Sequence, residues 1–168
     1  MSKAVMGGCQ CGAVRYSVAE LHDNAHLCHC RMYQKAVGNL FAALIGASKS
    51  KVSWTRGEPS VFRSSEHVER GFCEKCGTPL FYNYLSSERI NVTIGSLDHP
   101  ERVKPKGHDG IEGRMPWFSE LATLQDYGET EAGDSAEWAA AIKRTSRQHP
   151  DHDTEEWPPA AHQTESKP

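Results

Sequence analysis

Three short groups of cysteines carry the residue types most suited to chemistry in this sequence. Cys73 and Cys76 are separated by two residues within Gly71–Leu80, and a glycine follows the second of them. Two thiolates of such a tight turn converge on one ion at about 2.3 Å. Cys9 and Cys11, also followed by glycine, form a second pair. Together the two pairs predict a closed Cys₄ zinc site, which is structural because it has no open position for a substrate.

Two alternatives to a shared metal site remain open from the spacing. A pair could close a disulfide-bonded turn, or the two pairs could be unrelated to each other. Met1–Met6 is too short for the apolar region of a signal peptide, so we expect a reducing, cytoplasmic location. Metal binding is the more common role of Cys-x-x-Cys pairs in such a compartment, which favours the shared site.

The third group, Cys28-His29-Cys30, lies in a segment that reads as extended from Ala25 to Cys30. Alternate residues of a strand share a face, so His26, Cys28 and Cys30 are expected to point to one side. His29 is expected on the other side, as a strand residue hydrogen-bonded to backbone rather than as a ligand.

Short β-rich runs surround these cysteines and predict a mainly β fold. A buried strand is expected at 40–45, a short helical turn at 31–37 closed by Gly38, and a hairpin of 68–72 with 80–84 that places metal at its tip. Further strands are expected at 13–18, 52–55, 60–63 and 90–94. Residues 98–116, rich in Pro, Gly and charge, predict an ordered surface loop.

The composition changes beyond Gly128, which suggests a domain over 1–128 and a C-terminal extension over 129–168. Residues 135–144 predict a helix behind Asp134 as N-cap. After Pro150 the chain has almost nothing to bury, so an irregular or disordered tail is expected. The histidines of this tail are interpreted as tail residues rather than as a metal cluster; they are His149, His152 and His162.

Overall composition excludes several function classes. The chain has 168 residues, a net charge of −3 and 38% hydrophobic residues, and its mean hydropathy is −0.63. This charge offers no basic surface for nucleic acid. No apolar run approaches the roughly 20 residues of a membrane span. We therefore expect no nucleic-acid partner and no membrane association.

The order of these motifs resembles the glutathione-dependent formaldehyde-activating enzyme family, which includes centromere protein V. The matching pieces are Gly8–Gly12, Cys28–Cys30, Gly57–Pro59, Arg70–Leu80, Gly95–Asp98 and Arg114–Trp117. The resemblance covers roughly residues 6–120 and depends on ordered cysteine spacing, which is more specific than any single motif. It implies a small β fold of stacked antiparallel sheets with two zinc sites, the structural one at Cys9, Cys11, Cys73 and Cys76.

The resemblance also implies a catalytic zinc held by three cysteines spaced Cys-x-Cys-x-x-Cys. The first two are Cys28 and Cys30, but the third position is Tyr33. Whether a second zinc binds is therefore left open, since a productive site needs its full set of ligands. The replacements considered for the missing ligand are His26, His22, His108 and the Tyr33 phenolate, whose ordinary pKa of about 10 makes it a poor ligand.

Two functions follow as hypotheses. The first is a carbon-sulfur lyase acting on a glutathione-formaldehyde or related thiol adduct, with Cys28 and Cys30 at the catalytic centre and an activity that Tyr33 impairs. Arg15, Lys35 and Arg70 are then candidates for holding the carboxylates of the ligand, against the more common role of solvated surface charge. The second is a non-catalytic binding module that keeps the zinc-stapled fold without the chemistry.

Overall fold

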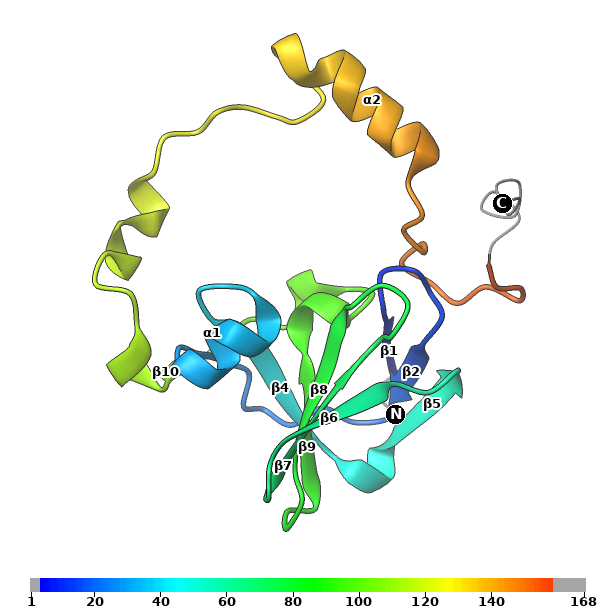
Figure 1. Cartoon of the computed structure of the whole chain (residues 1–168), viewed down its shortest axis with the longest axis vertical. Helices are drawn as coiled ribbons and strands as arrows, with labels where there is room; N and C mark the ends of the chain where they lie inside the picture. Colours follow the sequence, from blue (N-terminus) through cyan, green and yellow to red (C-terminus); the bar gives the residue numbers. More distant parts are fainter. Residues whose placement is uncertain (1–3, 159–168) are drawn as a thin grey trace.

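Two β-sheets form the body of the protein, as the computed structural model of residues 4–158 shows (Figure 1); of Asp134 only the backbone is described. The smaller sheet has the order β1-β2-β5, with β1 at Val5–Gly8, β2 at Arg15–Val18 and β5 at Val52–Arg56. The larger sheet has the order β10-β3-β4-β9-β8-β7-β6. Its strands are β3 (His26–Cys28), β4 (Ala42–Ser48), β6 (Ser60–Ser65), β7 (Val68–Phe72), β8 (Pro79–Tyr84), β9 (Arg89–Thr93) and β10 (Gly107–Asp109). Only the β10–β3 pair is parallel among these strands. The mainly β prediction is confirmed.

The main core lies between the two sheets. β2 contributes Tyr16 and Val18, which are fully buried, and the larger sheet contributes Leu80 and Val92. Because successive strand residues face opposite sides, the apolar residues of β2 at alternate positions point into this core. The Tyr16 hydroxyl lies 2.6 Å from the Ser96 hydroxyl, so the one polar atom that this ring buries has a partner.

The Cys28-His29-Cys30 segment is only partly the strand that the sequence predicts. β3 ends at Cys28, and Cys30 already precedes the helix α1 (Arg31–Val37) as its N-cap. The alternation expected across His26, Cys28 and Cys30 therefore stops at Cys28. α1 ends at Gly38, whose φ of 62° lies in the left-handed region, so the predicted helical turn and its glycine stop are confirmed.

The predicted hairpin is confirmed as β7–β8, with Val68 opposite Tyr84 and Phe72 opposite Pro79. The second cysteine turn lies at its tip. Because both strands are paired in register, the hairpin holds this turn in a fixed position relative to the sheet.

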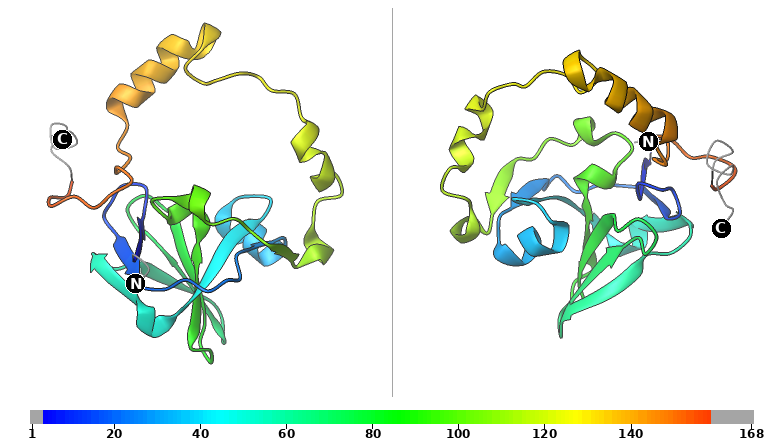
Figure 2. Two further views of the ribbon diagram at one scale, coloured as in Figure 1. Left: turned by 180° about the vertical axis from the view of Figure 1, so that it is seen from behind. Right: turned by 45° about the horizontal axis from the view of Figure 1, so that its top comes forward.

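The chain after residue 98 runs over the surface and then leaves the body. Residues 98–116 form the predicted surface loop, which also contains β10. From about residue 118 to 148 the chain forms a wide arch that returns beside β1, as the views in Figure 1 and Figure 2 agree. The arch carries α2 (Ala136–Thr145), which has no buried residue. Its N-cap is Ser135 rather than the predicted Asp134, because Gly133–Ser135 already form a 3₁₀ turn.

The remaining short helices are 3₁₀ turns: η1 (Lys49–Lys51), η2 (Ile94–Ser96), η3 (Pro100–Arg102), η4 (Ile111–Gly113), η5 (Phe118–Thr123) and η6 (Gly133–Ser135). Within residues 4–158, every helix is too short or too polar to span a bilayer.

Candidate functional site

The two cysteine turns meet in space. The Sγ atoms of Cys9, Cys11, Cys73 and Cys76 all lie within 4.8 Å of one another. Cys9 and Cys11 are 3.6 Å apart at sulfur, and Cys11 and Cys73 are 3.8 Å apart. Sulfurs bound to one Zn²⁺ at about 2.3 Å in a tetrahedron are about 3.8 Å apart, whereas disulfide sulfurs are about 2.05 Å apart. The four cysteines therefore form a cluster that can hold a metal ion, and the disulfide alternative does not fit.

Backbone and hydroxyl groups order the sulfurs of this four-cysteine cluster. The Val14 N–H donates to Cys9 Sγ over 3.3 Å, and the Thr78 hydroxyl lies 3.1 Å from Cys76 Sγ. Thr78 also accepts a hydrogen bond from the Gln10 N–H, so it links the first cysteine turn to the second. The two turns are thus joined by protein contacts as well as by any shared ion.

The thiols of the cluster differ in acidity. Burial raises the pKa of Cys11 and Cys73. Burial also acts to raise the pKa of Cys76, but hydrogen bonds from the Thr78 hydroxyl and from nearby backbone groups outweigh it and lower the value to about 6. One thiolate in the group is therefore favoured at neutral pH, and a cation would favour the others, since metal ligation requires deprotonated sulfur.

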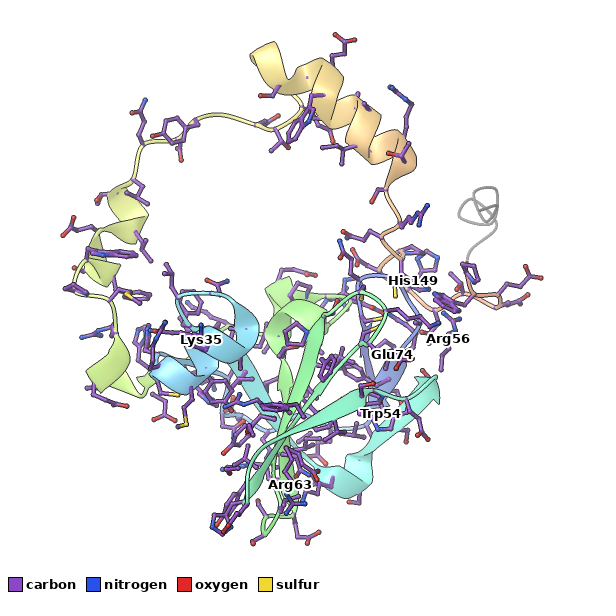
Figure 3. The ribbon with its side chains drawn as sticks, in the orientation of Figure 1. Lys35, Trp54, Arg56, Arg63, Glu74 and His149 are labelled. Atoms are coloured by element: carbon purple, nitrogen blue, oxygen red, sulfur yellow. The ribbon has the colours of Figure 1, made fainter. Side chains whose placement is uncertain are left out.

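The irregular C-terminal segment contacts the body of the protein. Residues 148–157, here called the strap, are irregular but pack over the four-cysteine cluster. The His149 N–H donates to the Gln10 carbonyl over 2.7 Å, and the Trp157 indole N–H donates to the Cys11 carbonyl. His149 is 4% exposed and lies beside Arg56, as Figure 3 shows. From residue 151 to 157 no side chain is buried and the chain is irregular, but Thr154 and Trp157 are half-buried, and Trp157 packs against the main core. His152 is exposed; His162 lies outside the described residues.

Gly12 makes room for the strap. Its φ is +77°, and a Cβ atom there would lie 2.1 Å from the His149 ring. Glycine is therefore required at this position both for backbone conformation and for close approach. On the other side, the Lys75 ammonium lies 5.4 Å from the centre of the Trp157 ring, a cation–π distance.

We predict that Trp157→Ala releases the strap. The substitution removes the bond to the Cys11 carbonyl and the Lys75 contact, which together contribute about 1–3 kcal/mol. Hydrogen exchange of the backbone at 148–157 should rise severalfold while the sheets keep their protection. Trp138→Ala is the matched control, because Trp138 is 67% exposed on α2. Equal exchange of the strap in both variants would contradict the prediction.

Arg15 is engaged inside the protein and is not available to a ligand. It is 3% exposed, and its guanidinium donates two hydrogen bonds to Asp98, at 2.7 and 2.6 Å. Its Nε donates to Asp153 of the strap over 2.8 Å. Asp98 is itself 7% exposed. Both interpretations of Arg15 from the sequence, a partner for a ligand carboxylate and a solvated surface charge, are wrong, because it is buried and all three of its nitrogens are bonded to these two aspartates.

Cys28 and Cys30 lie at and just beyond the end of β3, which β4 and β9 separate from the β7–β8 hairpin. Cys28 is buried and Cys30 is half-buried. Burial raises the pKa of Cys28 to about 11, and the neighbouring Cys30 adds to this. Both residues pack in a second small apolar cluster with Tyr33 and Leu44. In the absence of a cation Cys28 is therefore a neutral thiol at physiological pH.

None of the considered ligands joins Cys28 and Cys30. Among the residues that the structure describes, no set of three Cys, His, Asp or Glu donor atoms close enough for one ion includes either cysteine. His22 lies 3.3 Å from the Ser48 hydroxyl, and His26 lies 2.9 Å from the Asn24 carbonyl. Two thiols do not complete a zinc site, so the donor set present does not fit a second zinc.

The last two considered ligands, Tyr33 and His108, also have other roles. Burial raises the pKa of Tyr33, which keeps it a phenol, and the Arg70 guanidinium lies 4.3 Å from the centre of its ring. His108 Nδ1 lies 2.8 Å from Nε2 of His29. His29 is fully buried, and its hydrogen-bond partner is the His108 side chain rather than the predicted backbone group.

His29 sits in an aromatic pocket that the sequence did not reveal. Its ring packs against Phe41 and Phe118, and its Nδ1 has no hydrogen-bond partner among the described residues. Burial, with His108 and Arg114 nearby, lowers the pKa of His29, so the ring is neutral. His29 lies between Cys28 and Cys30 in sequence, so the packing of its buried, neutral ring anchors the turn that carries both cysteines.

The sequence analysis did not predict the roles of two residues near the four-cysteine cluster, Asp98 and Trp157. Asp98 belongs to the Gly95–Asp98 motif, but nothing local identifies it as the partner of Arg15. Trp157 did carry a signal, since a large aromatic residue in a chain segment otherwise rich in Pro and Glu is a candidate anchor.

Comparisons with known proteins agree with this geometry. The family described as glutathione-dependent formaldehyde-activating enzyme matches residues 4–111. The fold is similar to the crystal structure of a Rhodobacter sphaeroides protein, with a TM-score of 0.52 and 24% identity over 61% of this chain and 98% of that one. The family match spans both cysteine turns, the Cys28-His29-Cys30 segment and the sheets that join them. The chain therefore belongs to the glutathione-dependent formaldehyde-activating enzyme family.

Proposed function

We propose that this protein acts on a glutathione-formaldehyde or related thiol adduct as a carbon-sulfur lyase, with Cys28 and Cys30 at the reacting centre and one structural zinc ion at the four-cysteine cluster. The observation that carries the proposal is the retained Cys28-His29-Cys30 turn, held in the family fold between β3 and α1. In the forward reaction the thiol sulfur of the substrate adds to the carbonyl carbon of formaldehyde, and the thiol proton ends on the oxygen. The reverse reaction breaks the same carbon-sulfur bond.

The structural zinc is supported by the four-sulfur spacing. Cys9, Cys11, Cys73 and Cys76 would hold the ion, and its chemistry there is to fix the two turns and not to activate a ligand, because four thiolates leave no open position. The thiols must stay reduced to bind metal, which supports the cytoplasmic location proposed for the protein.

No step of the proposed reaction passes through a second zinc, because its donor set is incomplete. What the chain offers instead is a rigid pair of thiols. The Gln34 amide donates to the His29 carbonyl over 2.9 Å and to the Gly113 carbonyl over 2.8 Å, which fixes the turn. Because Tyr33 occupies the position of a third ligand, we expect slow turnover compared with a three-cysteine site.

The second candidate function is a non-catalytic zinc-stapled binding module. The observation that favours it is Tyr33, which belongs to the same apolar cluster as Cys28, stacks with Arg70 and takes the position of the third sulfur ligand. In this case the chain binds its small-molecule partner without converting it.

We predict that adduct formation from glutathione and formaldehyde exceeds the uncatalysed rate, and that Cys28→Ser or Cys30→Ser returns it to that rate. Exchange spectroscopy by NMR separates the two rates, since thiols react with formaldehyde spontaneously. Tyr33→Cys should raise the metal content from one ion to two per chain and increase turnover about 10²-fold or more, because it restores the third thiolate.

The control for each variant is the metal content of the four-cysteine cluster, which all three substitutions should leave at one ion. If the wild-type rate equals the uncatalysed rate, the lyase hypothesis is wrong and the non-catalytic binding module is the function that stands. Both candidate functions interpret Tyr33 as the replacement of a third zinc ligand. If Tyr33→Cys changed neither the metal content nor the rate, that interpretation would be wrong.

A further inference from the structure

A cavity lies between α1 and the outer strands of the larger sheet. Its volume is about 660 Å³, within the range of about 300–1,000 Å³ that small-molecule sites occupy. α1 forms one wall, and β6, β7 and β8 form the floor, where Phe62, Arg70 and Tyr82 lie side by side in register. Neither Cys28 nor Cys30 lines the cavity, whereas Tyr33, which belongs to the same apolar cluster as both, does.

The lining is mostly apolar, with several hydroxyl groups and two cations. Its hydrophobic part includes Val37, Leu44, Phe62, Val68, Phe72 and Phe81. Lys35 and Arg70 supply two positive charges, and none of the described residues that line the cavity is an aspartate or glutamate. The cavity is therefore suited to a ligand that has an apolar body and a negative charge.

Arg70 is arranged to receive that charge. Its guanidinium stacks on Tyr33 at 4.3 Å and lies 5.3 Å from the centre of the Tyr82 ring. Stacking uses the face of the guanidinium and leaves its in-plane N–H groups free for a carboxylate. Within the described part of the chain Arg70 has no ion-pair partner; the acidic neighbour on β7, Glu69, faces Arg63 instead, at 3.7 Å.

The lack of an acidic group in the lining also discriminates among acids. An amino acid or a γ-glutamyl peptide brings an ammonium group, which would lie near the positive charges of Lys35 and Arg70 with no aspartate or glutamate among the described residues of the lining to pair with. An acid without an amino group brings no such group.

We propose that this cavity binds a small apolar carboxylic acid that lacks an amino group, with Arg70 as the partner of the carboxylate. The proposal goes beyond the thiol chemistry and does not require the cysteines. A ligand here would lie against the outer face of the Tyr33–Tyr82 pair, whose ring centres are 5.3 Å apart.

The test uses three probes that share one skeleton: phenylbutanoate, the corresponding alcohol, and homophenylalanine, which adds only the α-amino group. Titration calorimetry on the full chain should give a dissociation constant below about 1 mM for phenylbutanoate. The alcohol and homophenylalanine should each bind about tenfold more weakly or worse. If either binds as tightly as phenylbutanoate, or phenylbutanoate does not bind, the proposal is overturned.

Variants locate the site. Arg70→Met should weaken phenylbutanoate about tenfold or more while leaving the alcohol unchanged. Arg63→Met is the matched control, because it removes the same charge from the neighbouring strand β6 and lies outside the cavity lining. Ala36→Trp, on the exposed side of α1, should fill the cavity and abolish binding of every probe. Unchanged phenylbutanoate binding in Arg70→Met or Ala36→Trp would place the ligand elsewhere and sink the proposal.

A cysteine variant separates this proposal from the proposed function. Cys28→Ser should bind phenylbutanoate as the wild type does, even though we expect it to lose adduct formation. Loss of phenylbutanoate binding in a folded Cys28→Ser protein would contradict an independent cavity. Absence of enzymatic activity, in contrast, would leave the binding result intact.

Discussion

Cys73→Ser is expected to remove the metal ion and unfold the body of the protein. Cys73 is fully buried at the tip of the β7–β8 hairpin, and its sulfur is one of four that surround the proposed zinc. Structural Zn²⁺ contributes about 10–16 kcal/mol in zinc-finger peptides, which is comparable to the whole stability of about 5–15 kcal/mol of a typical domain. Serine cannot replace a thiolate ligand, so most of this contribution is lost.

Two measurements check this expectation: zinc content by elemental analysis, and the thermal unfolding transition by circular dichroism. A strong chelator added to the wild type should reproduce the effect of the substitution, since it removes the same ion. Cys30→Ser is the matched control, because it makes the same chemical change outside the four-cysteine cluster. A folded Cys73→Ser protein with its zinc content and transition intact would show that the cluster does not hold the fold together.

Asp98→Ala is expected to lower the free energy of unfolding by about 3–5 kcal/mol, because it leaves the buried Arg15 charge without its main partner. The pair joins β2 to the segment after η2, and both of its side chains are almost fully enclosed. Burial opposes the charge of Arg15, but the two aspartates outweigh it and raise its pKa, so this side chain stays charged. The large effect comes from that remaining charge rather than from the strength of the ion pair itself.

Asp153→Ala is the comparison for this prediction. Asp153 is 45% exposed, and its bond to Arg15 is screened by solvent, so its loss should lower stability by only about 1 kcal/mol or less. Chemical denaturation of both variants gives the difference. The double variant Arg15→Met with Asp98→Leu should recover much of the lost stability, since it removes both charges from the interior. Equal, small effects at Asp98 and Asp153 would mean that the pair is hydrated.

The strap connects the four-cysteine cluster to the buried ion pair of Arg15 and Asp98. It reaches the four-cysteine cluster through His149 and Trp157, and it reaches the buried ion pair through Asp153. Burial and the nearby arginines lower the pKa of His149, so the ring that packs on Gly12 is neutral. One segment near the C-terminus thus covers the part of the body that the metal ion is proposed to hold together.

Local patterns in the sequence determined the parts of this protein that depend on neighbours along the chain. The alternation of 68–72 and 80–84 gave the hairpin, and Gly38 gave the end of α1. Each cysteine turn gave one pair of ligands, because its two cysteines are close in sequence, and the need of zinc for four ligands predicted that the two pairs meet. The family followed from the order of these pieces. The same reasoning identified Tyr33 as the departure from a three-cysteine site.

Only the tertiary structure decided which distant groups meet. Arg15 and Asp98 are 83 residues apart, and Trp157 is 146 residues from Cys11, so no local pattern couples them. A sequence shows that an arginine is present, but whether it is buried against aspartates, as Arg15 is, or stacked in an open cavity, as Arg70 is, depends on which strands become neighbours. That choice is made by packing of the whole chain, because burial and charge pairing are properties of the folded surroundings and not of the residue.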